Sequence, residues 1–86
     1  MRREAEFFGE AELDLIYMAR SLRDALKIEK LLEAADIDYA VETGTYTGGL
    51  LIKRDLTGAF FYVNETDVER GRAVLKQNGF KPYDPE

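Results

Sequence analysis

Short alternating runs of apolar residues predict three strands along the chain. Residues 13–20, LDLIYMAR, alternate in this way. One side would carry Leu13, Leu15, Tyr17 and Ala19, and the other side Ile16 and Met18. Since both sides are apolar, we expect this strand to lie in the middle of a sheet. Residues 37–42 and 58–63 alternate similarly and predict the second and third strands.

Two longer segments have the apolar spacing of amphipathic helices. The first begins after Ser21, a preferred N-cap residue, and stops at Asp36, where a left-handed residue is usual. The second follows Asn64 and stops at Gly79. Gly71 lies inside the second helix at a cost of about 1 kcal/mol relative to alanine, so we expect a close backbone approach there.

The apolar arc of the first helix is wider than one sheet contact requires. Its core stripe consists of Ala25, Ile28, Leu32 and Ala35. Leu22 and Leu26 lie outside this stripe. We therefore expect the N-terminal arm, residues 1–11, or a second subunit to cover that side of the helix.

The two halves of the chain repeat one order of elements. A shift of 43 residues aligns Ser21 with Asn64 and Asp36 with Gly79. Two βαβ units with right-handed crossovers place both helices on one face of an antiparallel sheet. The prediction is an α+β, ferredoxin-like β-α-β-β-α-β sandwich, formed by residues 12–86 as a single domain. Its fourth strand would be short, because Pro82 and Pro85 interrupt it.

A family resemblance rests on two stretches. LIYMARSLRDALKIEKLLEAADIDYAV and the later GAFFYVNETDVERGRAVLKQNGF resemble the small bacterial family of signal transducing proteins, a domain group of unknown function. The family's Leu-Leu-Glu-Ala-Ala-Gly-Ile phrase stands here at residues 31–37, with Asp36 in place of glycine. The resemblance implies a signalling role, and the family has no established catalytic residues to carry over.

Composition narrows the chemistry further. The 86 residues contain neither histidine nor cysteine, so the commonest general base and the commonest soft metal ligands are missing. We therefore expect no enzyme, and assign no catalytic, cofactor-binding or metal-binding residues. The net charge of −5 disfavours nucleic acid and anionic membranes. No apolar run has the length of a membrane span or signal peptide, which favours a cytoplasmic protein.

The stretch 43–58 is rich in glycine and surrounds Tyr46. A phosphate-binding loop would need a GxxxxGK[ST] pattern leading into a helix, whereas this stretch leads into a predicted strand. We expect Gly48 and Gly49 to form a turn or bulge and residues 54–58 to turn the chain back. The hairpin is longer than most, which favours contact with a partner.

The tyrosine-bearing strands suggest a second contact region. If Tyr17 and Tyr62, or Phe60, lie on the sheet face away from the helices, that face is an aromatic interaction surface. The alternative is that Tyr17 and Tyr39 fill the edge of the core, since strand parity alone does not identify the covered face. The candidate interaction surface comprises Tyr17, Tyr46, Gly48, Gly49, Phe60 and Tyr62.

Three functions remain as hypotheses. The leading one is a non-catalytic interaction or regulatory module that acts through protein–protein association, as a homo-oligomer or an adaptor. The alternative is a sensing domain that binds a small metabolite or nucleotide with the 43–58 hairpin. RNA binding fits the strand order, but Thr57 replaces the leading basic residue of the RNA-binding strand motif, and the net charge is unfavourable.

Overall fold

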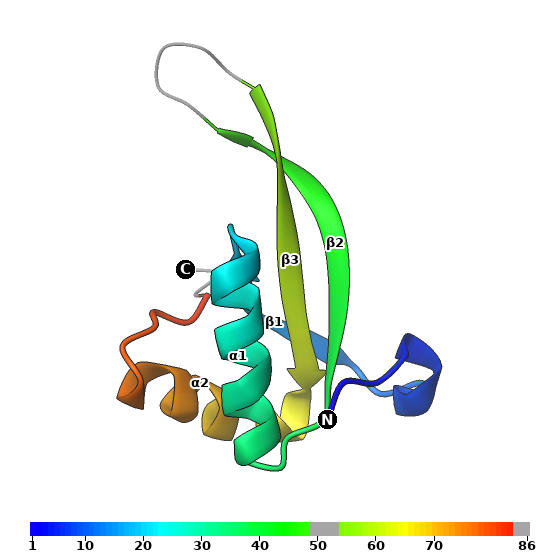
Figure 1. Cartoon of the computed structure of the whole chain (residues 1–86). Helices are drawn as coiled ribbons and strands as arrows, with labels where there is room; N and C mark the ends of the chain where they lie inside the picture. The colour runs from blue at the N-terminus through cyan, green and yellow to red at the C-terminus, as the bar shows by residue number, and fades with distance from the viewer. Residues whose placement is uncertain (49–53, 84–86) are drawn as a thin grey trace.

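The computed structural model describes residues 1–48 and 54–83, with the backbone alone for 45–48 and 54–57. Three strands and two α-helices form the domain shown in Figure 1. In chain order the elements are η1 (Ala5–Phe8), β1 (Leu13–Ala19), α1 (Leu22–Ala34), β2 (Tyr39–Gly48), β3 (Arg54–Asn64), η2 (Glu65–Asp67) and α2 (Val68–Gln77). The two η elements are short 3-10 helices.

The sheet is antiparallel, with the strand order β1-β3-β2. β2 and β3 pair without interruption from Tyr39 with Val63 to Gly48 with Arg54. β1 pairs with β3 only as far as Ala19 with Ala59. Beyond that point the sheet has two strands, which project past both helices (Figure 1). We call residues 44–48 and 54–58 the ribbon; they replace the turns expected at Gly48 and at 54–58.

Both helices pack on the same face of the sheet. One hydrophobic cluster joins buried residues from both helices and all three strands. It contains Ile16, Ala19, Ile28, Leu32, Ile37, Tyr39, Phe61, Val63 and Leu75. The α+β class, the antiparallel sheet and the two helices are therefore confirmed, while the described residues form three of the four predicted strands.

A bulge in β1 changes which residues face the helices. Leu15 pairs with Tyr62 and Tyr17 pairs with Phe61, so Ile16 is the extra residue. Ile16 is fully buried, and its Cδ1 lies 3.2 Å from where a Cβ on Gly71 would be. Ile16 and Tyr17 therefore both face the helices, and the strict alternation predicted for this strand is wrong. At Gly71 the close approach is made by a side chain rather than by the backbone.

The helix ends follow the local signals of the sequence. The Ser21 hydroxyl accepts the N–H of Asp24 at 3.1 Å, which caps α1. Asp36 has a φ of 58° and Gly79 a φ of 84°. The N–H groups of Ile37 and Phe80 donate to carbonyls five residues earlier, at 3.0 and 2.9 Å. Both helices therefore end in the same left-handed Schellman turn, as the 43-residue shift predicts.

As far as the structure describes it, to Tyr83, the predicted fourth strand is represented by one backbone contact with β1. Residues 80–83 contain no strand, and the Tyr83 N–H donates to the carbonyl of the bulged Ile16 at 2.7 Å. Pro82 is buried but has no N–H with which to extend the pairing. Pro85 lies outside the described residues.

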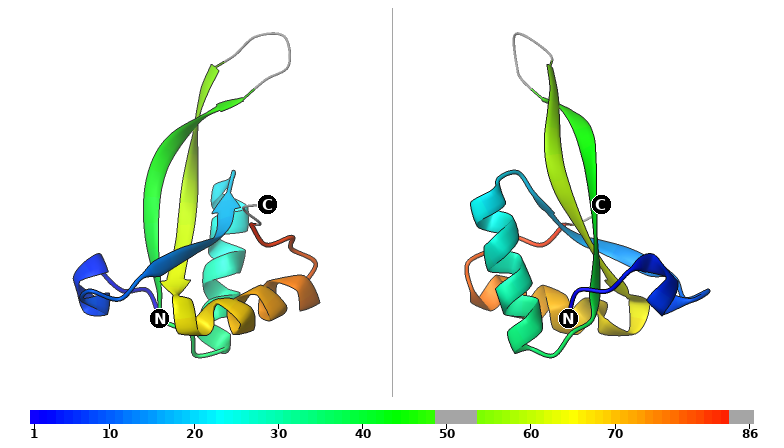
Figure 2. Two further views of the ribbon diagram at one scale, coloured as in Figure 1. Left: turned by 180° about the vertical axis from the view of Figure 1, so that it is seen from behind. Right: turned by 45° about the vertical axis from the view of Figure 1, so that its right-hand side comes forward.

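The N-terminal arm is docked on the outer edge of β2. The Arg3 N–H donates to the Tyr39 carbonyl at 2.7 Å, and the Tyr39 N–H donates to the Met1 carbonyl at 3.0 Å. η1 lies on the side away from both helices in each view of Figures 1 and 2. The arm therefore does not cover Leu22 and Leu26, which are 75% and 49% exposed.

Candidate interaction surface

The sheet face opposite the helices carries a row of partly exposed apolar side chains. Phe61 and Val63 belong to the core, so their neighbours Phe60 and Tyr62 lie on the other face. On that face Phe60 is paired with Met18, and Tyr62 with Leu15. These four side chains are half-buried and lie on the sheet face opposite the core residues Phe61 and Val63. We call Leu15, Met18, Phe60 and Tyr62 the open face.

Gly44 provides the space in which the Phe60 ring lies. A Cβ built at Gly44 would lie 3.0 Å from Cε2 of Phe60 and 3.6 Å from Cδ2. The aromatic ring therefore lies along the strand and across Gly44, rather than pointing straight into solvent. This glycine has a packing role, and any larger residue there would displace the ring from the open face.

Tyr62 presents a neutral phenol at the open face. Burial raises the pKa of Tyr62 above its ordinary value, and the nearby Glu42 carboxylate raises this pKa further. Glu42 is exposed and lies opposite Phe60 on β2. The open face thus combines apolar area with a hydroxyl that can donate a hydrogen bond and a carboxylate at its margin.

Tyr17 does not belong to the open face. Its ring meets the Phe80 ring edge-on, with centroids 5.7 Å apart, on the side of the sheet that the helices cover. Burial raises the pKa of the Tyr17 phenol, Asp24 raises it further, and Arg20 opposes this rise. Tyr17 therefore does not lie on the sheet face away from the helices. Its half-buried ring lies at the edge of the core, which was the alternative prediction for this residue.

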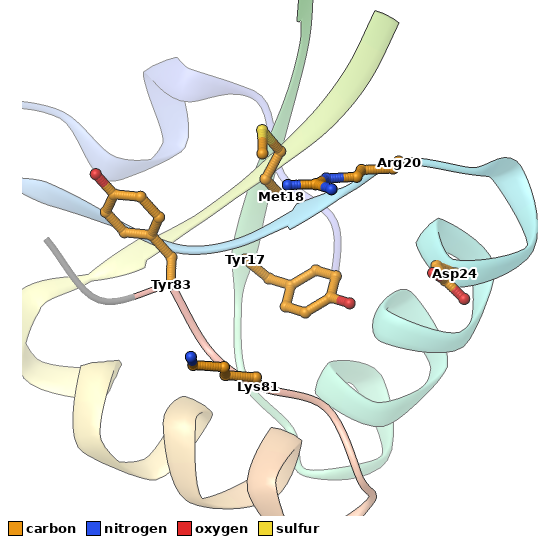
Figure 3. A pocket seen from close by; sticks show the side chains of 6 residues that line it. All are labelled: Tyr17, Met18, Arg20, Asp24, Lys81 and Tyr83. Atoms are coloured by element: carbon orange, nitrogen blue, oxygen red, sulfur yellow. The ribbon is translucent and has the colours of Figure 1, made fainter. Parts of the chain in front are cut away.

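A cavity of about 350 Å³ opens beside Tyr17, where a fourth strand would have continued along β1. Its walls come from β1, the first turn of α1 and the segment after α2 (Figure 3). The lining residues are Tyr17, Met18, Arg20, Asp24, Lys81 and Tyr83. Two cations, one carboxylate and two phenols would suit a small polar ligand with both charges.

The predicted hairpin residues are placed along the ribbon. Tyr46 pairs with Leu56, and Gly48 is the last residue of β2, while Gly49 lies outside the described residues. At the base of the ribbon, Thr43 and Gly58 form one wall of a smaller apolar groove of about 190 Å³, whose other wall includes Leu22 and Ala25. The five predicted residues that the structure describes are thus split between the open face, the core edge and the ribbon.

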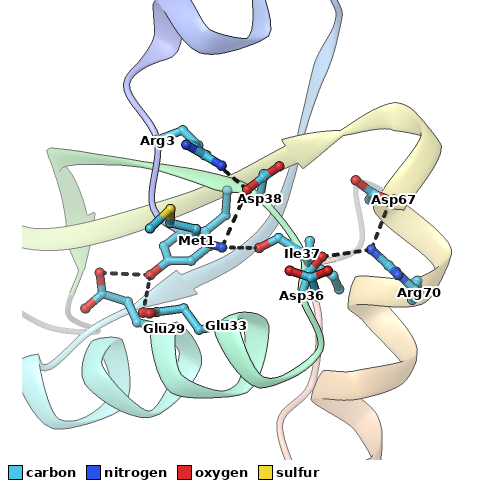
Figure 4. A network of polar contacts seen from close by, with 10 residues as sticks. Met1, Arg3, Glu29, Glu33, Asp36, Ile37, Asp38, Asp67 and Arg70 are labelled. Carbon is cyan, nitrogen blue, oxygen red and sulfur yellow. Dashed lines mark hydrogen bonds and ion pairs between the residues drawn. The ribbon is translucent and has the colours of Figure 1, made fainter.

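Tyr39 contacts Glu29 and Glu33, which belong to a polar network with a structural role; Figure 4 labels both glutamates. The fully buried ring of Tyr39 carries a hydroxyl whose single proton is shared between the carboxylates of Glu33, at 3.0 Å, and Glu29, at 3.3 Å. Burial raises the pKa of Tyr39 strongly, and the hydrogen bond to Glu33 adds to the rise. Arg3 pairs with Asp38 at 3.0 Å and stacks over Phe7 at 4.3 Å, which fixes the arm beside this network.

Sequence reasoning missed Leu15, Met18 and Gly44. Leu15 and Met18 share a face only because the bulge interrupts the alternation between them. Gly44 was counted among the loop glycines, and its role depends on the register of β2 against β3. The sequence feature that indicated this surface was the alternation of residues along β3, which places Phe60 and Tyr62 on one side of the strand.

Other site types find no support in the described part of the chain. Within residues 1–48 and 54–83, no three acidic, histidine or cysteine side chains are grouped so that they could hold a metal ion. The helices described are too short and too polar to cross a membrane. Comparison with family models, with curated proteins and with solved structures gave no match.

Proposed function

We propose that this protein is a non-catalytic interaction module that acts by protein–protein association, as a homo-oligomer or an adaptor. The observation that carries the proposal is the open face, where two adjacent cross-strand pairs place four half-buried apolar or aromatic side chains together in a chain of which 34% is charged. Contiguous apolar surface of this kind marks contact sites. A partner would cover Leu15 and Met18 and approach Tyr62 with a hydrogen-bond acceptor.

The proposal also includes a ferredoxin-like fold and a location in the bacterial cytoplasm. The domain is a ferredoxin-like sandwich whose fourth strand is represented, within the described residues, by the Tyr83–Ile16 contact. The strand order β1-β3-β2 and the packing of both helices on one face support this. The resemblance to the small bacterial signal transducing proteins supports a signalling role in a bacterial cytoplasm. The lack of cysteine fits a compartment without disulfides.

Site-specific photo-crosslinking in cells tests the open face. A benzoylphenylalanine in place of Tyr62 should give a cross-linked adduct of discrete mass, because a partner covers that position. The matched control carries the same group at Glu69, an exposed residue on α2. Equal adduct patterns at the two positions, or no adduct at position 62, would contradict the proposal.

A second candidate is the sensing of a small metabolite or nucleotide, favoured by the mixed-charge cavity beside Tyr17. A thermal-shift screen with amino acids and nucleotides should find a ligand that raises the Tm. Lys81→Gln should remove the shift if the ligand lies in this cavity. A shift that survives Lys81→Gln but is lost in Gly48→Val would place the ligand on the hairpin instead.

A further inference from the structure

The outer edge of β2 presents a row of backbone groups to its surroundings. The N–H and the C=O of Tyr39 both point outward, because they bond to the N-terminal arm. Outward and inward groups alternate along an antiparallel strand, and β2 pairs with β3 from residue 39 to 48 without a register shift. The backbone groups of Val41, Thr43, Thr45 and Thr47 therefore point outward as well.

The N-terminal arm satisfies only the first part of this edge. Its backbone bonds end at Tyr39, and within the described chain no backbone bond reaches Val41, Thr43, Thr45 or Thr47 from outside the sheet. β2 contains neither proline nor a bulge. Such an edge is a template for pairing with another strand.

The two edges of the ribbon differ in their protection. The β3 side reads RDLTG, with Arg54 and Asp55 as charges that discourage pairing. The β2 side, residues 43–48, reads TGTYTG and carries no charge. An isolated two-stranded ribbon is marginally stable in water, so the ribbon gains most from a third strand on its β2 side.

A second copy of the chain fits this edge by symmetry. A two-fold interface must be self-complementary, and residues 44–48, GTYTG, read the same in both directions. Antiparallel pairing about Tyr46 places Thr45 opposite Thr47 of the second copy, a pair of residues that stabilises sheets. Glu42 falls outside the five paired positions, so two chains of net charge −5 meet where neither is charged.

We propose that two copies pair antiparallel through the outer edges of β2, centred on Tyr46, into one continuous sheet. The inference rests on the proposed association function and names its partner as a second copy of this chain. It leaves the open face, which lies toward the other end of β3, available in the dimer.

Two proline variants test the edge, with Thr57 as the matched control. Thr45 and Thr57 are direct cross-strand partners of the same residue type, and their outward backbone groups point to opposite edges of the ribbon. Sedimentation velocity over a concentration series should show a wild-type dimer. Thr45→Pro should weaken dimerisation about 30-fold, since each dimer loses two hydrogen bonds, while Thr57→Pro should leave it unchanged.

Three results would overturn the inference. The first is a monomeric wild-type protein at every concentration. The second is a dimer whose dissociation constant is the same in Thr45→Pro as in the wild type. The third is a dimer that only Thr57→Pro weakens. If Thr45→Pro does not fold, hydrogen exchange measured on the wild-type protein tests whether the β2 edges are paired. The amides of Thr45 and Thr47 should become more protected as protein concentration rises, and unchanged exchange at these two amides would equally overturn the inference.

The crosslinking experiment fails independently of this one. A dimer lost in Thr45→Pro, together with no adduct at position 62, would support the paired edge and contradict association through the open face. An adduct at position 62 from a strictly monomeric protein would support association through the open face and contradict the paired edge.

Discussion

At the scale of single residues, the Tyr39 hydroxyl couples stability to alkaline pH. Its pKa is raised above the ordinary value of 10 by burial and by its hydrogen bond to Glu33. Below pH 10 the phenol is neutral in both the folded and the unfolded chain, so its full contribution is present. As the pH rises further, the unfolded chain loses the proton first, and the free energy of unfolding falls.

Tyr39→Phe should reveal this dependence. Near neutral pH the variant should lose about 1 kcal/mol of unfolding free energy, because the hydrogen bonds to the two carboxylates are gone. Above pH 10 the wild type should lose up to about 1.4 kcal/mol per pH unit relative to the variant. Urea denaturation between pH 7 and 11 measures both. Tyr83→Phe, at an exposed tyrosine, is the control.

Asp36 and Gly79 both end a helix with a positive φ, so exchanging the two residue types should have opposite effects on stability. Asp36→Gly should raise the free energy of unfolding by about 0.5 kcal/mol, because glycine adopts a positive φ at no steric cost. Gly79→Asp should lower it by a similar amount; no atom lies within 4 Å of the added Cβ, so backbone conformation alone decides. Shifts of the same sign for the two variants in thermal denaturation would contradict this account.

At the scale of elements, α2 packs closely against β1 at Gly71, where the side chain of Ile16 leaves little room for a larger residue. Gly71→Val should destabilise the protein by about 1–3 kcal/mol, since the new side chain meets the buried Ile16. Gly71→Ala should be nearly neutral, because better helix propensity offsets the 3.2 Å approach to Ile16. Ala73→Val, on the exposed side of α2, controls for the cost of a branched residue in the helix. Chemical denaturation compares the three.

The helix boundaries were predictable because their signals are local. The Ser21 cap and the left-handed Asp36 depend on hydrogen bonds within a few residues. The faces of β1 were not predictable in the same way. The extra residue at Ile16 is defined only against β3, and it places Tyr17 on the covered side.

The lengths of the two paired strands were underestimated for a related reason, since strands were predicted over 37–42 and 58–63 and the structure has Tyr39–Gly48 and Arg54–Asn64. Glycines at 44, 48 and 58 are breaker signals in isolation, yet uninterrupted pairing with the opposite strand keeps all three in regular strands. The docking of the N-terminal arm depends on the edge of β2, a partner far away in sequence. Part of the candidate site could therefore be predicted, namely Phe60 and Tyr62, while their neighbours Leu15 and Met18 required the register.

At the scale of the whole molecule, the projecting ribbon and the packed body are separable. The molecule measures 40 × 29 × 26 Å, and the core residues described by the structure come from outside the ribbon. Replacing residues 45–57 by an Asn-Gly turn should change the free energy of unfolding by no more than about 1 kcal/mol. The same deletion should abolish the dimer. Denaturation and sedimentation together measure this, and a deletion that leaves the chain unfolded would show that the body depends on the ribbon.

The reach of the ribbon beyond the helices also sets the geometry of any pair joined there. Bodies linked at their ribbon edges stand at the two ends of a shared sheet, so each keeps a free binding strip. Such a pair is a bivalent clamp: a target with two copies of the recognised motif would bind about 100-fold or more tighter than a target with one, through effective concentration alone.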